Sequence, residues 1–325
     1  AFSGCKVLVV GDVILDAYVY GETVRVSREA PVLVVRKESQ EHRLGGAANT
    51  AINLVELGAQ VEVLTAVGPD EGARVLKKML GAVGVGTDAV IEVDTSTPVK
   101  TRVLAGAVGT TRQQVLRLDD EPKALSADVS AQLAGLLREH AKGAKAVVVS
   151  DYGLGTVGDE VIAVARELAA DGTIVCVDSR YGLDRFSGVT AVTPNQPEAE
   201  AVVGFRIDSE DDIERAGKIL REKLGAEAVL LTLGRRGMTL FGDGASSHVD
   251  IVGEEDVTDV TGAGDTVMAT FCLALAAGLG MENGMRLANC AAGVVVTKTG
   301  AATCSPEELR RAALGASMEL ITWDE

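Results

Sequence analysis

The stretch from Asp259 to Thr266 reads Asp-Val-Thr-Gly-Ala-Gly-Asp-Thr and combines two glycines with a carboxylate. Gly262 and Gly264 allow a tight turn, and the apolar run that begins at residue 267 predicts a helix with Asp265 in its first turn. The first amides of a helix lack internal acceptors and can bind an anion. Because Asp265 can also accept a proton from an attacking hydroxyl, this stretch suits phosphoryl transfer. The alternative interpretation is that Asp265 only stabilises the helix dipole.

Two more carboxylates follow the first predicted strand. Residues 6–10 form a β-branched apolar run that ends at Gly11, which is typical of a buried parallel strand. Asp12 and Asp16 then lie at the carboxyl end of that strand, where ligands bind in open α/β sheets. They could accept hydrogen bonds from a polyol. Alternatively, Asp12 serves turn chemistry and Asp16 is solvated.

A glycine pair lies near the start of the next periodic segment, residues 44–57, which predicts a helix that ends at Gly58. Gly45 and Gly46 are followed by two alanines and Asn49, so a ligand could approach the helix start closely. The alternative is that the small residues only allow close packing of this helix on the sheet.

From residue 60 the chain alternates between predicted strands and helices. The predicted strands are 60–66, 146–150 and 173–177, and the predicted helices are 71–80, 126–141 and 161–170. Such alternation predicts an α/β fold with three layers, in which helices cover both faces of a mostly parallel sheet. No linker or internal repeat divides the chain, so we interpret residues 1–325 as a single domain. The segments 18–37, 99–104 and 113–118 have β-like composition outside this alternation and predict further strands.

Four predicted strand ends carry polar clusters. These are Ser150-Asp151-Tyr152-Gly153, Asp178-Ser179-Arg180, the segment 193–198 (Thr-Pro-Asn-Gln-Pro-Glu) and the segment 232–237 (Thr-Leu-Gly-Arg-Arg-Gly). Any one cluster is compatible with ordinary loop chemistry. Because the carboxyl ends of parallel strands meet at one edge of the sheet, the four together predict a ligand site there.

Composition excludes several classes of protein. The chain of 325 residues has a formal net charge of −16, which argues against broad binding to nucleic acid or to an anionic membrane. Its three His are far apart, and its five Cys show no paired spacing, which favours reduced thiols in a cytoplasmic protein without a His-based metal site. We find no secretory leader and no apolar run long enough to span a membrane. The Gly-Lys-Ser/Thr P-loop is also missing.

These motifs resemble those of the ribokinase/PfkB family of carbohydrate kinases over essentially the whole chain. The stretch that ends in Gly-Ala-Gly-Asp is similar to the C-terminal signature of that family, which implies that Asp265 is the catalytic base. By the same resemblance Gly262, Ala263 and Gly264 line the anion hole. The implied substrate-binding residues are Asp12, Asp16, Gly45, Gly46, Asn49, Lys100 and Arg102. The β segments, about 17–43 and 97–118, are implied to form a lid over the sugar, through which two subunits often pair.

The resemblance also implies a nucleotide site and metal ions. Asn195 and Glu198 fit the Asn-x-x-Glu pattern that orders Mg²⁺ and its waters, and such contacts through water suit this ion. Asp259 and Thr261 match positions where many members bind K⁺. The implied nucleotide-binding residues are Asn195, Thr232, Gly234, Gly237 and Asn289.

Within the family, the chain looks most similar to the heptose 7-phosphate kinase branch that begins ADP-heptose synthesis. The similar segments are 29–32, 44–49, 99–102 and 113–119. Lys100, Arg102 and Arg117 could bind a sugar phosphate near the lid, or they could form surface ion pairs with acidic neighbours such as Asp119.

The chain departs from that branch at three places. Arg28 replaces a proline, Leu154 replaces a lysine, and Ser179-Arg180 replaces Pro-Lys. Arg28 or Arg180 could supply the missing charge. Some members carry a fused nucleotidyltransferase domain that this sequence lacks, so we expect only the kinase step from it.

The predicted function is therefore an ATP-dependent and Mg²⁺-dependent sugar kinase, with heptose 7-phosphate as the expected acceptor and a homodimer as the expected assembly. The alternatives are a kinase for another sugar, such as fructose or ribose, and a binding protein without turnover. An NAD-linked oxidoreductase is disfavoured because no Gly-x-Gly-x-x-Gly fingerprint follows the first strand.

Overall fold

The computed structural model describes residues 2–107, 111–252 and 258–316. Its centre is a nine-stranded sheet in the order β13-β12-β11-β10-β9-β8-β1-β4-β5. All neighbours from β11 to β5 are parallel, whereas β12 and β13 are antiparallel at one edge. The strands are β1 Lys6–Gly11, β4 Gln60–Val67, β5 Val90–Glu92, β8 Ala146–Asp151, β9 Ile174–Ser179, β10 Ala191–Val192, β11 Ala228–Thr232, β12 Met238–Phe241 and β13 Ser247–Val249.

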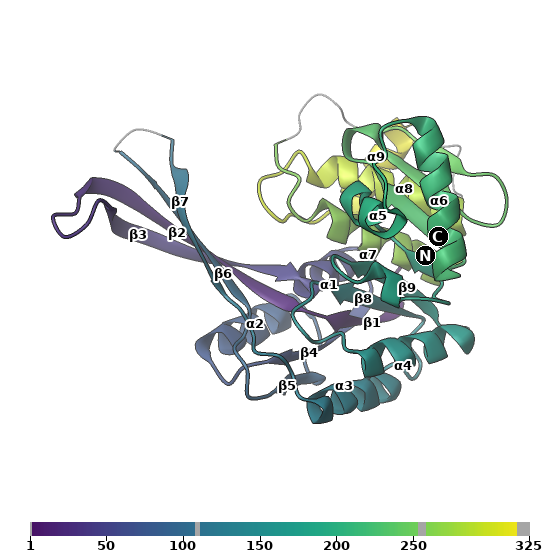
Figure 1. The fold of residues 1–325 in the computed structure, drawn as a ribbon, viewed down its shortest axis with the longest axis horizontal. Helices are drawn as coiled ribbons and strands as arrows, with labels where there is room; N and C mark the ends of the chain where they lie inside the picture. Colours follow the sequence, from purple (N-terminus) through teal and green to yellow (C-terminus); the bar gives the residue numbers. More distant parts are fainter. Residues whose placement is uncertain (1, 108–110, 253–257, 317–325) are drawn as a thin grey trace.

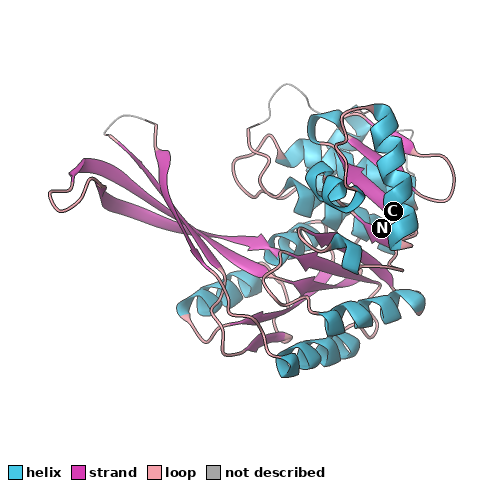
Figure 2. Ribbon diagram, viewed as in Figure 1, coloured by secondary structure: helices cyan, strands magenta, loops and turns pink. Residues whose placement is uncertain are grey.

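Helices cover both faces of this sheet (Figure 2). One face carries α1 Ala47–Glu56, α2 Glu71–Ala82, α7 Ala263–Ala276, α8 Met281–Val295 and α9 Pro306–Gly315. The other face carries α3 Ala127–His140, α4 Asp159–Ala170, α5 Gln196–Val203 and α6 Glu210–Leu224. The predicted three-layer α/β fold is thus confirmed, and the predicted strands 60–66, 146–150 and 173–177 and helices 71–80, 126–141 and 161–170 are present to within three residues.

Side chains of β1 show why the strand is buried on both sides. Val7 and Val9 belong to the apolar cluster under α1 and α7, and Leu8 and Val10 belong to the cluster under α3 and α4. Successive side chains of a strand point to opposite faces, so a strand covered on both faces must be apolar throughout. This arrangement positions Asp12, the residue after β1, at an edge of the sheet.

A separate four-stranded sheet projects from the body of the molecule (Figure 1) and corresponds to the predicted lid. Its order is β3-β2-β6-β7, with β2 and β6 parallel and the other two pairings antiparallel. The strands are β2 Val13–Val26, β3 Leu33–Gly46, β6 Val99–Gly106 and β7 Gln113–Asp120. Residues 108–110 of the predicted lid lie outside the described residues.

The lid begins earlier in the chain than predicted. Only Asp12 separates β1 from β2, so Asp16 lies inside a lid strand and not in a turn after β1. Likewise Gly45 and Gly46 end β3, and α1 begins at Ala47. Gly11 and Asp12 predicted the end of β1, but residues 13–15 are apolar and buried like those of β1 and already belong to β2.

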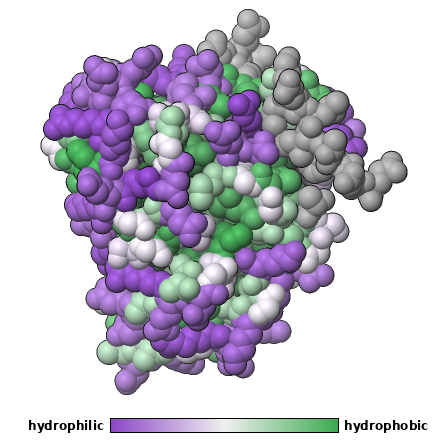
Figure 3. Space-filling view, turned by 90° about the vertical axis from the view of Figure 1, so that its right-hand side faces the viewer, coloured by the Kyte–Doolittle hydropathy of each residue, from purple (hydrophilic) through white to green (hydrophobic). Residues whose placement is uncertain are grey.

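The surface and the cysteines agree with the composition. One face of the molecule is largely hydrophilic, with smaller hydrophobic areas near its middle (Figure 3). No helix among residues 2–107, 111–252 and 258–316 is long and apolar enough to cross a membrane. All five cysteines are buried.

We expect Gly217→Ala to lower the free energy of unfolding by about 1–3 kcal/mol, as overpacking of a core does. Gly217 lies on the buried side of α6, and a Cβ atom there would overlap the ring of Phe241. Urea denaturation measures the change. Gly135→Ala is the matched control, because Gly135 lies in α3 with no atom near its Cβ position, and alanine there should stabilise the helix by roughly 0.5–1 kcal/mol. Equal effects at both positions would contradict the packing argument.

Candidate active site

A cavity of about 740 Å³ opens at the carboxyl ends of β8 to β11 and reaches the N-terminus of α7. It gathers segments that are far apart in the sequence. Its lining includes Tyr152, Asp178, Arg180, Asn195, Glu198, Thr232, Gly234, Gly237, Thr261 to Asp265 and Asn289. The four polar strand-end clusters therefore converge as the topology predicted.

Asp265 is the most enclosed carboxylate of this cavity, with 6% of the residue exposed. Its Oδ2 accepts a hydrogen bond from Asn49 Nδ2 at 2.7 Å. Its Oδ1 accepts two, from Thr50 Oγ1 at 3.2 Å and from Tyr152 Oη at 2.9 Å. Burial raises the pKa of Asp265, and the three donors oppose that shift. The carboxylate is thus held in one orientation, as a general base must be.

The N-terminus of α7 provides unpaired amides beside this carboxylate. Gly262 caps the helix with φ of 78°, a conformation that glycine adopts readily. The Ala263 amide donates to Val260 O at 3.2 Å, but within the described residues the amides of Gly264 and Asp265 have no acceptor. These two N–H groups are the donors that an anion would meet.

The N-terminus of α1 meets that of α7. A Cβ atom on Gly262 would lie 2.5 Å from Asn49 Nδ2, so the two helix starts are in close contact. Further inside, Thr266 Oγ1 donates to Asn53 Oδ1 at 2.9 Å, and Asn53 Nδ2 donates to Asn49 O at 2.9 Å. Asn49 is 1% exposed, yet its Oδ1 has no partner among the described residues. This oxygen is therefore a buried acceptor for which the described residues supply no partner, and Asn49 does not line the cavity.

Asp12 has partners that the sequence did not predict. Its carboxylate accepts backbone hydrogen bonds from Tyr152, Leu154 and Thr156, each at 2.9 Å, and only 2% of the residue is exposed. Burial raises its pKa against these donors. The side chain therefore anchors the loop after β8, a contact over 140 residues of sequence that neither the polyol interpretation nor the turn interpretation predicted.

The cationic side chains near the lid differ in their pairing. Arg102 forms an ion pair of 2.5 Å with Asp16, which also lies against Gly45. Arg117 binds Asp119 through two nitrogens, at 2.7 and 2.6 Å, as in the surface-pairing alternative. Arg28 forms no ion pair in the described part of the chain and lies outside the cavity.

Two other cations have no carboxylate within ion-pair distance in the described part of the chain. They lie near the ring of Tyr152, Lys100 Nζ at 5.9 Å and Arg180 Cζ at 4.7 Å from its centroid. Burial lowers the pKa of Lys100. These two cations are available for an anionic ligand.

Asn195 and Glu198 form the capping box of α5. Glu198 N donates to Asn195 Oδ1 at 3.0 Å, and Asn195 N donates to Glu198 Oε2 at 2.9 Å. Burial raises the pKa of Glu198. The pKa of Asp178 is raised well above its ordinary value by burial and by repulsion from the charges of Glu198 and Asp265. The cavity therefore contains crowded carboxylates, which a cation would stabilise.

The remaining predicted nucleotide residues also line the cavity. Thr232 ends β11 and donates its amide to Pro194 O at 2.9 Å, and Gly234 and Gly237 form the next turn with positive φ. Asn289 of α8 is buried and donates to Asp250 O at 2.7 Å.

Asp259 and Thr261 lie just before α7. Asp259 Oδ1 accepts the Thr261 amide at 2.9 Å, and Oδ2 accepts the Gly300 amide at 2.8 Å. Burial would raise the pKa of Asp259, but these hydrogen bonds outweigh it and lower the pKa. Asp259 is therefore ionised at neutral pH. Thr261 lines the cavity, whereas Asp259 does not.

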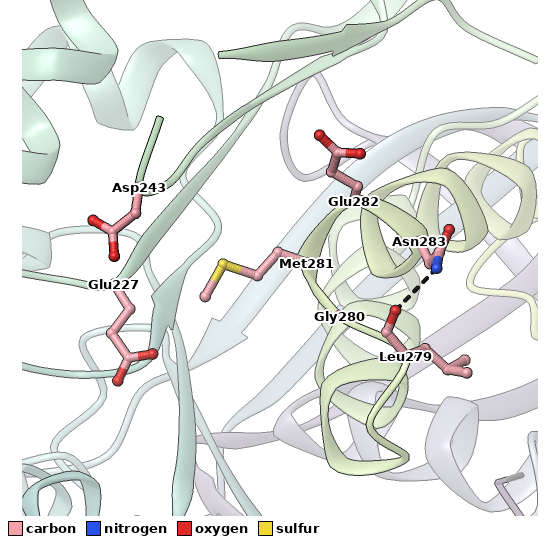
Figure 4. A pocket seen from close by; sticks show the side chains of 7 residues that line it. All are labelled: Glu227, Asp243, Leu279, Gly280, Met281, Glu282 and Asn283. Atoms are coloured by element: carbon pink, nitrogen blue, oxygen red, sulfur yellow. Dashed lines mark hydrogen bonds between the residues drawn. The ribbon is translucent and has the colours of Figure 1, made fainter. Parts of the chain in front are cut away.

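A second, smaller cavity of about 400 Å³ lies between the sheet edge and the start of α8 (Figure 4). Its side chains include the carboxylates Glu227, Asp243 and Glu282, and Met281 points into the space between them. Because no cation lines it, it is a poor site for phosphate groups. In the described residues, no group of three His, Cys, Asp or Glu side chains there or elsewhere could hold a metal ion directly.

The fold and the site together define an α/β enzyme of the carbohydrate kinase class. The family model described as pfkB family carbohydrate kinase matches residues 5–308, and the chain belongs to this family. The predicted family is thus confirmed, and with it the class of enzyme, a phosphotransferase with an alcohol group as acceptor.

Two relatives and one solved structure illustrate the similarity. The chain is 42% identical over 309 residues to the D-beta-D-heptose 7-phosphate kinase of Bordetella bronchiseptica, covering 94% of this chain and 95% of the relative. It is 40% identical over 307 residues to the bifunctional protein HldE of Pelobacter propionicus, covering 93% of this chain but only 62% of that relative. The ribokinase of Arabidopsis thaliana, solved with ribose and ATP, has a TM-score of 0.73 at 22% identity and covers 95% of this chain and 98% of its own.

Sequence reasoning gave no role to Tyr152 and Thr50, which both donate to Asp265. The sequence indicated that Tyr152 lies near the site, because this residue belongs to a polar strand-end cluster. Nothing in the sequence indicated Thr50, since a threonine inside an apolar helix pattern is ordinary.

Proposed function

We propose that this protein transfers the γ-phosphoryl group of ATP to a hydroxyl of a phosphorylated sugar, heptose 7-phosphate. The observation that carries the proposal is the position of Asp265. It is a buried carboxylate in the first turn of α7 that lines a 740 Å³ cavity, next to two amides that have no acceptor among the described residues. A base, an anion site and room for a nucleotide are the parts that phosphoryl transfer needs.

In the proposed mechanism Asp265 accepts the proton of the sugar hydroxyl as its oxygen attacks the γ-phosphorus. The new P–O bond forms as the bond to the β-phosphate oxygen breaks, and ADP leaves. The amides of Gly264 and Asp265 donate to the phosphoryl oxygens while their charge changes. Asn49 donates to Asp265 Oδ2 and helps to hold the base in place.

The residues present fit a magnesium ion held mainly by phosphates and water. Burial, and after it the repulsion from Glu198, raises the pKa of Asp178, and a cation there would relieve the repulsion. Mg²⁺ keeps several waters, so Asn195 and Glu198 can contact it through water while their capping box stays intact. When bound, the ion neutralises charge on the phosphates.

The proposal places the nucleotide against Thr232, Gly234, Gly237 and Asn289, which line the cavity. Potassium would be held near Asp259 and Thr261 and would add positive charge beside the anion-binding turn. The ionised state of Asp259 fits a cation there.

The identity of 42% with a heptose 7-phosphate kinase over nearly its full length supports a phosphorylated acceptor. Lys100 and Arg180, both without a carboxylate partner in the described residues, support it too. Arg180 stands where the heptose 7-phosphate kinase branch has a lysine. It is therefore our candidate for the positive charge that replaces this lysine.

Kinase assays with a panel of acceptors test this function. ATP-dependent ADP release should be fastest, by kcat/KM, with heptose 7-phosphate, slower with fructose 6-phosphate, and slowest with fructose and ribose. A higher kcat/KM for an unphosphorylated sugar would contradict the proposed acceptor. Binding of sugar and ATP without turnover would contradict the kinase assignment.

We also propose a cytoplasmic homodimer that pairs through the lid. Several apolar side chains of the lid are exposed, among them Val26, Leu116 and Leu118 at 59%, 49% and 54%. Light scattering at micromolar concentration should give twice the monomer mass, and Leu116→Lys with Leu118→Lys should halve it. Val83→Lys is the control, since Val83 is exposed but follows α2, outside the lid. A wild-type monomer would count against this assembly.

A further inference from the structure

The loop after β8 places a phenol against the proposed base. Tyr152 Oη donates to Asp265 Oδ1 at 2.9 Å. Burial, together with the neighbouring charge of Asp265, raises the pKa of Tyr152 well above its ordinary value. The phenol therefore stays protonated at neutral pH and can only donate to the carboxylate.

Hydrogen bonds to Asp12 hold this loop in place. Three loop amides, those of Tyr152, Leu154 and Thr156, donate to the buried Asp12 carboxylate. The start of the loop has a second anchor, because Gly153 N donates to Asp151 Oδ1 at 2.9 Å. Hydrogen bonds to a carboxylate are stronger than those between neutral groups, so the backbone under Tyr152 is well defined.

The ring of Tyr152 is fixed as well. Arg180 Cζ lies 4.7 Å and Lys100 Nζ 5.9 Å from its centroid, distances at which a cation is attracted to an aromatic ring. Tyr152 thus stands between the nucleotide cavity, which it lines, and the lid strand β6, which carries Lys100.

The geometry points to Tyr152 as a positioning residue that fixes Asp265 so that Oδ2 receives the proton of the sugar hydroxyl. Oδ1 already accepts from Tyr152 and Thr50, whereas Oδ2 accepts only from Asn49. A carboxylate oxygen has about two lone-pair sites, so Oδ1 is filled and Oδ2 keeps one site. The inference rests on the proposed kinase function, in which Asp265 is the base.

The charged groups around Asp265 come from several elements. Asp178 and Arg180 lie at the end of β9, and Glu198 and Asp151 lie near Asp178. On α1 the facing groups, Asn49 and Thr50, are neutral. Tyr152→Phe leaves all these charges in place and removes the phenol oxygen, which is hydrogen-bonded to Asp265 and to Arg180. A shift of the pH profile therefore reports the loss of the hydrogen bonds of the phenol.

We expect Tyr152→Phe to lower kcat for heptose 7-phosphate roughly tenfold or more, since a hydrogen bond to a charged group is strong, with little change in KM. Phenol donation favours the ionised form of Asp265, so its loss raises the pKa of Asp265. The base is then protonated up to a higher pH, and the acid limb of the kcat profile moves to higher pH. Tyr181→Phe is the matched control, because Tyr181 is 82% exposed, and it should leave kcat and the profile unchanged.

A variant with 3-fluorotyrosine at position 152 keeps the hydroxyl and the packing, so it tests the inference even if Tyr152→Phe does not fold. Its more acidic phenol donates more strongly and should move the acid limb to lower pH. Two results would overturn the inference: an acid limb that stays in place in both variants, and a raised KM with unchanged kcat, which would mean that the phenol binds the acceptor. If the wild-type protein phosphorylates no sugar of the panel, the kinase proposal fails too, whereas an active wild type with unshifted variants removes only the role of Tyr152.

Discussion

Asp265→Asn should lower kcat by about 10²–10⁴-fold, the usual contribution of general-base catalysis. The amide cannot accept the proton of the sugar hydroxyl. The fold should survive, because the donors around position 265 can adapt. If the Asn49 amide turns over, its unpartnered Oδ1 can accept from the new Nδ2, and Thr50 and Tyr152 can still donate to the remaining oxygen.

Steady-state kinetics and calorimetry with ATP measure this variant. Nucleotide affinity should change little, because the amides at the start of α7 stay in place. Asp128→Asn is the control for the helix dipole, since Asp128 lies in the first turn of α3 and is exposed, so its loss should cost only about 0.3–1 kcal/mol of stability. A near-normal kcat for Asp265→Asn would place the base elsewhere.

Gly264→Val would act on a different part of the same site. No protein atom lies near the Cβ position of Gly264, which lines the cavity. The added side chain would therefore occupy space for phosphate and weaken ATP binding together with turnover. This contrast with Asp265→Asn separates the base from the anion hole.

Lys100→Gln should lower kcat/KM for a phosphorylated acceptor roughly tenfold or more, because a hydrogen bond between charged groups contributes about 1.5–3 kcal/mol. Lys100 is half-buried near Tyr152 and, although Asp16 and Asp119 act on it at longer range, no carboxylate of the described residues lies within ion-pair distance. A phosphate group would therefore form its first close ion pair. Reactions with fructose or ribose should be unaffected, because these sugars carry no phosphate.

Arg117→Gln is the matched control for this prediction. Its guanidinium is already bound to Asp119 through two hydrogen bonds, so its removal should change the preference for phosphorylated sugars little. If Lys100→Gln lowers kcat/KM equally for all acceptors, Lys100 does not recognise the phosphate group of the acceptor. If Arg117→Gln has the larger effect, the phosphate lies farther out on the lid.

Much of the fold could be predicted because its signals are local. A β-branched run such as residues 6–10 must be a strand buried on both faces, and Ser126 before a periodic segment predicts a helix start, which its bond to the Val129 amide bears out. The convergence of four polar clusters followed from the direction of parallel strands alone. The roles of the residues in them stay predictions.

The partners of the charged side chains could not be predicted, because they depend on contacts between distant segments. Asp12 and Asp16 are four residues apart, yet one binds the amides of 152–156 and the other binds Arg102. Lys100 and Arg102 are neighbours on one lid strand, yet only Arg102 has an ion pair in the described part of the chain. No local pattern distinguishes the members of such pairs.

The join between β1 and β2 has a consequence for engineering and for evolutionary change. Since a single residue, Asp12, separates the strands, an insertion or deletion there would shift the whole lid and the anchor of the 152–156 loop at once. The turn between β2 and β3, residues 27–32, is far from the cavity and closes on itself through the bond from Ser27 N to Val32 O. Length variants of the lid should therefore accumulate at its tip, and a designer who changes the length of the lid should do so there and leave the root intact.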